Sequence, residues 1–174
     1  MNDPIEHHIP TGIEDPVANY TLISVIAHWT GAIAIIFLFL THEDEWLTYH
    51  VSVGMLLAVP LLARVIYRWS KGFPRSVDQH PALNFLSRLV MIGMLLVVLV
   101  TAVTGALLPL FAGEPYTLFA LGSWAAPYSG NQLIHALLEE THDAAGHVII
   151  PLFALHLLGF AKHMIFGKGG NRMR

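Results

Sequence analysis

Residues 142–156 read HDAAGHVIIPLFALH, an apolar stretch with a histidine at each end. Because fourteen residues are close to four helical turns, His142 and His156 project from nearly the same helix face, about 21 Å apart. Histidine is costly inside a membrane helix, so two in register predict a functional role. This spacing favours two haems, one near each side of a bilayer, if partner histidines exist at both depths.

The composition is typical of an integral membrane protein. Of 174 residues, 55% are hydrophobic and 12% are charged, and the mean hydropathy is +0.58. The sequence contains no cysteine, which excludes disulfides, covalent c-type haem attachment, iron–sulfur clusters and thiolate zinc sites. With eleven histidines in the chain, imidazole is the expected ligand of any metal or cofactor.

The predicted fold is an all-α, four-helix membrane bundle. Four segments can cross a hydrocarbon core that requires about 20 apolar residues: residues 20–41, 50–69, 84–108 and 143–166. We expect a polar N-terminal tail over 1–19, one transmembrane domain over 20–166 and a basic C-terminal tail over 167–174. A short surface helix is expected at 130–141, leading into the fourth span.

The basic residues predict the orientation of the bundle. All nine flank the second connection or follow the fourth span: Arg64, Arg68, Lys71, Arg75, Arg88, Lys162, Lys168, Arg172 and Arg174. The positive-inside rule therefore places both termini in the cytoplasm. The outer connections carry only acidic charge: Glu43, Asp44, Glu45, Glu114, Glu139, Glu140 and Asp143.

This topology arranges the histidines in two pairs. His28 and His156 lie in the cytoplasmic halves of the first and fourth spans, whereas His50 and His142 open the second and fourth spans on the outer side. Two histidines on facing helices of a bundle can bind one haem iron between them. The sequence therefore predicts two b-type haems in the bundle core, each with bis-histidine ligation.

His42 is an alternative partner for the outer pair, because it also lies fourteen residues from His28. The neighbouring residues favour His50 over His42. A haem needs small residues beside its ligands, and a glycine follows each favoured histidine by three or four positions. These glycines are Gly31, Gly54, Gly146 and Gly159, whereas Glu45 and Trp46 follow His42.

Three further residues are candidates on the cytoplasmic side. Arg64 lies fourteen residues after His50 on the same face, and a guanidinium inside the bundle could bind a haem propionate. Lys162 and His163 follow the fourth span, where they could reach an inner propionate or a quinone head-group, although snorkelling to the interface explains them nearly as well.

Several motifs together resemble the bacterial cytochrome b561 family, over about residues 20–172. They are YTLISVIAHW at 20–29, HVSVG at 50–54 with Arg64, and the His142–His156 spacing followed by Lys162 and His163. The family consists of four-helix dihaem membrane cytochromes whose ligands come from the first, second and fourth helices. The resemblance implies the ligands His28, His50, His142 and His156. The third span departs from the usual family pattern, with Arg88, Met91 and Ala102-Val103-Thr104-Gly105.

The resemblance implies electron transfer between the quinone pool and a donor or acceptor on the outer side, in contact with membrane lipid. Two alternatives stay open: a superoxide oxidase that reduces ubiquinone, and a haem-bearing anchor subunit of a larger dehydrogenase. The acidic outer loops favour a basic periplasmic partner such as a cytochrome c over an anion such as superoxide. No nucleic-acid partner is expected, and the sequence leaves the catalytic residues, and whether the chain is itself an enzyme, undecided.

Overall fold

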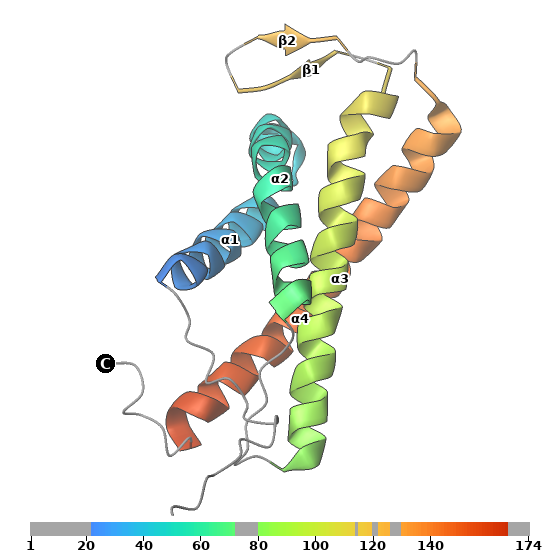
Figure 1. Cartoon of the computed structure of the whole chain (residues 1–174). Coiled ribbons are helices and arrows are strands. Elements are labelled where there is room, and N and C mark those ends of the chain that lie inside the picture. The colour runs from blue at the N-terminus through green and yellow to red at the C-terminus, as the bar shows by residue number, and fades with distance from the viewer. Residues whose placement is uncertain (1–21, 72–79, 114, 120–121, 126–129, 167–174) are drawn as a thin grey trace, which may run out of the picture.

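The computed structural model describes residues 22–71, 80–113, 115–119, 122–125 and 130–166. Within these residues, helices dominate (Figure 1). The elements in chain order are α1 (Leu22–Leu40), the short 3-10 helix η1 (Asp44–Trp46), α2 (Leu47–Lys71), α3 (Pro81–Phe111), β1 (Tyr116–Thr117), β2 (Ser123–Trp124) and α4 (Gln132–Phe166). The all-α prediction is confirmed. The predicted terminal tails lie outside the described residues.

Three of the four expected spans are confirmed as helices long and apolar enough to cross a membrane. They cover Leu47–Ser70, Pro81–Phe111 and Gln132–Lys162. The apolar part of α1 extends only over Ser24–Leu40. At about 1.5 Å per residue this part is about 26 Å long, slightly less than a hydrocarbon core of about 30 Å. Among the described residues α1 is therefore the shortest of the four α-helices.

The fourth helix corrects the prediction of a separate surface helix at 130–141. α4 is one continuous helix of 35 residues, which begins at Gln132. The side-chain oxygen of Asn131 accepts from the Ile134 amide at 3.2 Å and starts the helix. No proline or glycine follows until Gly146, so nothing in the sequence ends the helix early. His142 consequently lies about three turns inside α4 and does not open it.

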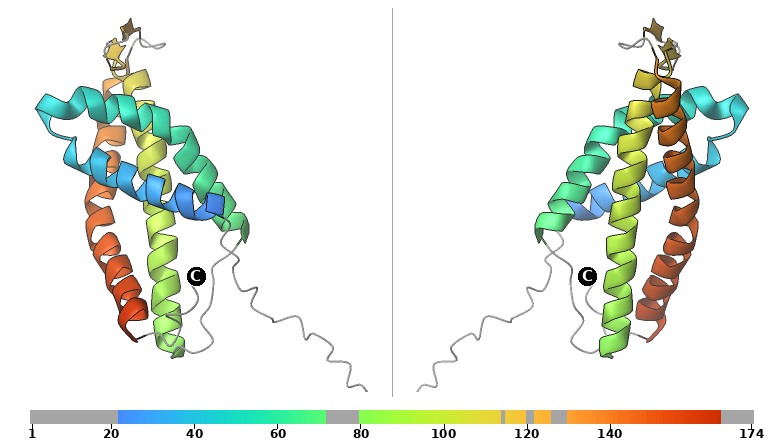
Figure 2. Two further views of the ribbon diagram at one scale, coloured as in Figure 1. Left: turned by 90° about the vertical axis from the view of Figure 1, so that its left-hand side faces the viewer. Right: turned by 90° about the vertical axis from the view of Figure 1, so that its right-hand side faces the viewer.

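α3 and α4 run side by side along the length of the molecule, and α2 packs against α3 (Figures 1 and 2). α2 bends near its middle, where Pro60 lies inside the helix. α1 packs on α2 and crosses the other helices obliquely (Figure 2). α1 and α2, which carry His28 and His50, thus lie on the same side of α3 and α4 (Figure 2).

The core is small and most large apolar side chains face outward. Leu61 and Val65 of α2 pack with Val98 of α3 at its centre. Side chains such as Val59 and Ile165 are 73% and 71% exposed. An apolar outer surface of this extent suits a protein surrounded by lipid rather than by water.

The connection between α3 and α4 folds over the first turns of α2. β1 and β2 form a small antiparallel hairpin, in which Tyr116 pairs with Trp124. Ser52, only 1% exposed, joins this connection to α2. Its hydroxyl donates to the Thr48 carbonyl at 2.6 Å and accepts from the Phe119 amide at 2.7 Å. The connection is therefore fixed two residues from His50.

Candidate functional site

The structure brings the four favoured histidines together in two pairs from three helices. His50 of α2 faces His142 of α4, with ring centroids 6.0 Å apart and planes at 90°. His28 of α1 faces His156 of α4, with centroids 6.2 Å apart and planes at 70°. The pairing predicted from helix depth is thus the pairing that the helices bring together.

Both separations suit one iron held between two imidazoles. A metal–nitrogen bond of about 2 Å on each side, plus about 1.1 Å from each nitrogen to its ring centroid, gives about 6.2 Å between centroids. The observed 6.0 and 6.2 Å agree with this sum. Direct hydrogen bonding between the two rings would bring their centroids closer together than this. The donor sets therefore fit bis-histidine haem.

The outer pair lies in a cavity of about 580 Å³ between the four helices, a volume within the range of about 300 to 1,000 Å³ usual for cofactor pockets. Its wall includes both histidines and the glycines of α2, α3 and α4, Gly54, Gly105 and Gly146. Carboxylates of α4 lie at one side: Glu139, Glu140 and Asp143. The outer site is therefore an apolar cavity with an acidic border.

The backbone of α1 fixes the imidazole of His50. Its Nδ1 lies 2.7 Å from the Leu38 carbonyl. A carbonyl oxygen only accepts, so Nδ1 carries the proton and donates, and the lone pair is on Nε2. This is the tautomer that a haem-binding histidine requires for ligation through Nε2. The sequence offers no signal for this contact, because the acceptor is a main-chain atom.

Arg64 lies in the inner site, although its contact differs from the predicted one. Its Nη2 is 2.7 Å from Nδ1 of His28. A guanidinium only donates, so Nδ1 of His28 accepts and the ring proton is on Nε2. Ligation of a metal by Nε2 and this hydrogen bond exclude each other. For His28 to bind iron through Nε2, Arg64 must release it and take another acceptor, such as a propionate.

The four predicted glycines fall into two classes. On α4, a Cβ added at Gly146 or Gly159 meets nothing within 4 Å, so both positions border open space. A Cβ at Gly31 would lie 3.8 Å from Cδ of Arg64, and one at Gly54 would lie 3.8 Å from Cδ2 of Leu38. The space beside the histidines is therefore largest along α4, the helix that contributes to both pairs.

His42, the alternative partner, is engaged elsewhere. Its Nδ1 lies 2.6 Å from the Phe39 carbonyl and its Nε2 lies 3.4 Å from a carboxylate oxygen of Glu43. Its side chain is 51% exposed at the border of the outer cavity. His147 is similarly oriented by Asp143, with 3.4 Å between Nδ1 and Oδ1. Both residues line the cavity, but their rings contact Phe39, Glu43 and Asp143.

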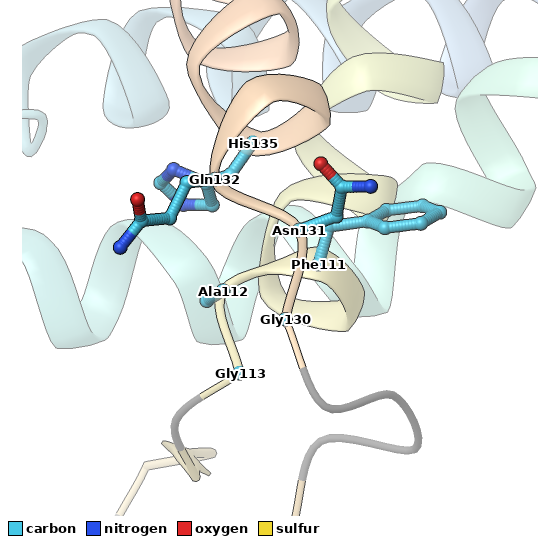
Figure 3. A pocket seen from close by; sticks show the side chains of 7 residues that line it. All are labelled: Phe111, Ala112, Gly113, Gly130, Asn131, Gln132 and His135. Atoms are coloured by element: carbon cyan, nitrogen blue, oxygen red, sulfur yellow. The ribbon is translucent and has the colours of Figure 1, made fainter.

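The remaining candidates lie outside both pairs. Lys162 is exposed near the end of α4, and the side chain of His163 lies outside the described part of the structure. His135 lines a separate cavity of about 480 Å³ where α3 ends and α4 begins, with Phe111, Asn131 and Gln132 (Figure 3). Its Nδ1 is 3.8 Å from Oε2 of Glu139, so His135 belongs to the interfacial end of the bundle.

The comparison with known families identifies the family of the chain. A family model described as prokaryotic cytochrome b561 matches residues 19–173. No curated protein sequence matches the chain. The matched region includes all four paired histidines and every described helix.

Proposed function

Because the chain belongs to the prokaryotic cytochrome b561 family, whose members bind haem b and transfer electrons in bacterial membranes, we propose that it carries two b-type haems. His50 and His142 would hold the outer haem, and His28 and His156 the inner one. The observation that carries this proposal is the pair of centroid separations, 6.0 and 6.2 Å. His42 then has no ligand role.

Each bound haem would supply one-electron redox chemistry. The chain's own residues would hold the haems and set the distance between them. Each pair of histidines would give two ligands to one haem iron, so neither iron would keep an open site for oxygen binding. α4 spaces His142 and His156 by fourteen residues, or about 21 Å.

The proposed direction of the bundle follows from the distribution of basic residues. In the sequence, all nine lysines and arginines flank the second connection or follow the fourth span, which supports cytoplasmic termini in the bacterial inner membrane. The chain would then connect the quinone pool with a donor or acceptor at the outer face. Arg64, Lys162 and His163 are the proposed polar contacts on the cytoplasmic side, for a propionate or a quinone head-group.

Arg64 gives a test of the inner site. We expect Arg64→Leu to lower the midpoint potential of the inner haem, because a nearby positive charge favours the reduced iron. A charge effect on the order of 1 kcal/mol corresponds to about 40 mV for a one-electron couple. A spectroscopic redox titration in a His142→Ala background isolates this haem. Arg64→Lys, which keeps the charge, should restore most of the potential, and an unchanged potential in Arg64→Leu would exclude the proposed contact.

The acidic border of the outer cavity supports a cationic redox partner, such as a basic cytochrome c. Glu139, Glu140 and Asp143 border the cavity that holds the outer pair. Electron transfer to a cationic cytochrome c, measured by stopped flow, should slow about tenfold as ionic strength rises from about 10 to 150 mM. Glu139→Gln with Glu140→Gln should flatten that dependence.

Superoxide oxidation is the alternative activity, and the same charges distinguish it. The acidic border repels an anion, so added salt should leave the rate of superoxide oxidation unchanged or raise it. A strong fall of that rate with salt would contradict the electrostatic argument. Activity that appears only with a co-purifying dehydrogenase would instead favour the role of an anchor subunit.

A further inference from the structure

We propose that α3, which supplies none of the four proposed ligands, positions the outer ligand His142 through the adjacent residues Thr104 and Gly105. Thr104 would hold the imidazole in its iron-binding tautomer, and Gly105 would provide the space that the ring occupies. This inference rests on the proposed function, in which His142 binds the outer haem. It gives α3 a role in setting the potential of the outer haem, although α3 contributes none of the four proposed ligands.

The hydrogen bonds of Thr104 define the proton on His142. The Thr104 hydroxyl is buried, with 7% of the residue exposed, and it donates to the Val100 carbonyl at 2.7 Å. Its oxygen lies 3.1 Å from Nδ1 of His142. Because its one proton is directed to Val100, the hydroxyl accepts from His142, and Nδ1 is the donor.

The Thr104 contact thus places the ring proton of His142 on Nδ1. The Nε2 lone pair of His142 is therefore free for a metal. His50 has the same tautomer, because its Nδ1 donates to the Leu38 carbonyl. In both outer histidines Nε2 therefore carries the lone pair that a metal would bind.

Gly105 is required for the ring to occupy this position. A Cβ at residue 105 would lie 2.7 Å from Cε1 and 3.2 Å from Nδ1 of His142. Carbon atoms in contact normally lie about 3.5 to 4.0 Å apart. Any side chain at 105 would therefore push the imidazole away from α3, break the contact with Thr104 and move Nε2 relative to His50.

The inner pair differs in this respect. Nδ1 of His28 accepts from Arg64, whereas both outer histidines donate from Nδ1. A hydrogen-bond acceptor for the Nδ1 proton makes the imidazole a stronger electron-pair donor to the metal through Nε2, and this stabilises ferric iron. α3 should thus hold the potential of the outer haem below the value that it would have without Thr104.

The test is a redox titration of Thr104→Val in the purified full-length protein. A His156→Ala background leaves the outer haem alone for measurement. We expect the outer haem to stay bound and its ferric-to-ferrous equilibrium to shift threefold to tenfold toward the reduced form, which is about 30 to 59 mV. Thr104→Ser should restore the original potential.

Thr101→Val is the matched control. It removes a hydroxyl from the same helix, three residues from Thr104, but that hydroxyl donates to the Val97 and Val98 carbonyls. Its outer haem should keep the wild-type potential. An equal shift in both valine variants, or no shift in Thr104→Val with the outer haem bound, would overturn the positioning role.

Gly105→Ala tests the second residue. With His156 intact, the variant should lose its outer haem or show an altered low-spin ferric spectrum for it, while the inner haem stays bound and reports a folded bundle. Two unaltered haems in Gly105→Ala would refute the close approach. Failure of the proposed function would look different, because the outer haem would then persist in His142→Ala itself.

Discussion

His142→Ala is expected to yield a protein with one b-type haem, the inner one, and His156→Ala to yield a protein with only the outer one. In the proposed arrangement each imidazole would be one of two ligands of a haem iron, and an apolar cavity without that ligand would provide little to hold the cofactor. The pairs lie about 21 Å apart along α4, so loss of one haem should leave the other in place. The haem content of each purified variant, measured as pyridine haemochrome, checks this result.

The partner ligands should show the same division. His50→Ala should reproduce the loss seen in His142→Ala, and His28→Ala that seen in His156→Ala. His42→Ala is the matched control, because His42 borders the outer cavity but bonds to Phe39 and Glu43. It should retain both haems. Loss of a haem from His42→Ala, with retention in His50→Ala, would reverse the assignment of the outer ligand.

Gly146→Leu and Gly159→Leu are each expected to remove one haem without unfolding the bundle. A Cβ at either position meets nothing within 4 Å, so the protein has room for a side chain there. That room lies beside His142 and His156, four and three residues after them, where the plate of each haem must pass. Gly146→Leu should lose the outer haem, and Gly159→Leu the inner one.

Gly93→Leu is the control for Gly146→Leu and Gly159→Leu. A Cβ at Gly93 would lie 3.4 Å from both methyl groups of Leu152, between the closely packed helices α3 and α4. Gly93→Leu should therefore reduce thermal stability and the content of both haems together. Thermal unfolding and haem content, measured on all three variants, separate the two patterns. Full haem content in Gly146→Leu and Gly159→Leu would mean that the space belongs to lipid rather than to the cofactor.

The long helices and their depth could be predicted from sequence, because uninterrupted apolar runs specify membrane helices directly. The structure extends the second and third predicted spans by two or three residues at each end, since α2 and α3 continue past the apolar stretch, whereas α1 lies within the predicted span. The start of α4 was missed for a related reason. Residues 132–141 are too polar for a span and were read as a separate helix, although nothing in them stops helix propagation.

The pairing of His28 with His156 and of His50 with His142 could be predicted from depth alone, because residues at one depth in a small bundle are neighbours. The hydrogen-bond partners of the Nδ1 atoms of these histidines could not be predicted from sequence. Leu38 contributes a main-chain carbonyl, which has no sequence signature. Thr104 and Gly105 stood out only as a departure from a family pattern, and their role depends on how closely α3 approaches α4. Helix-to-helix distance is not encoded in hydropathy.

At the inner site, the contact that Arg64 makes also could not be predicted from sequence. Its spacing from His50 placed it at the depth of the inner pair, and the structure puts it there. Spacing could not reveal that its guanidinium contacts His28 itself. That contact depends on the angle at which α1 crosses α2, which neither periodicity nor composition specifies.

The haem-to-protein ratio of the detergent-purified wild-type protein, with its dithionite-reduced spectrum, tests the central claim most directly. We expect two b-type haems per chain, one for each histidine pair. A ratio of one would mean that one of the 6.0 and 6.2 Å pairs does not bind iron. A ratio of zero after expression with ample haem would contradict the account as a whole.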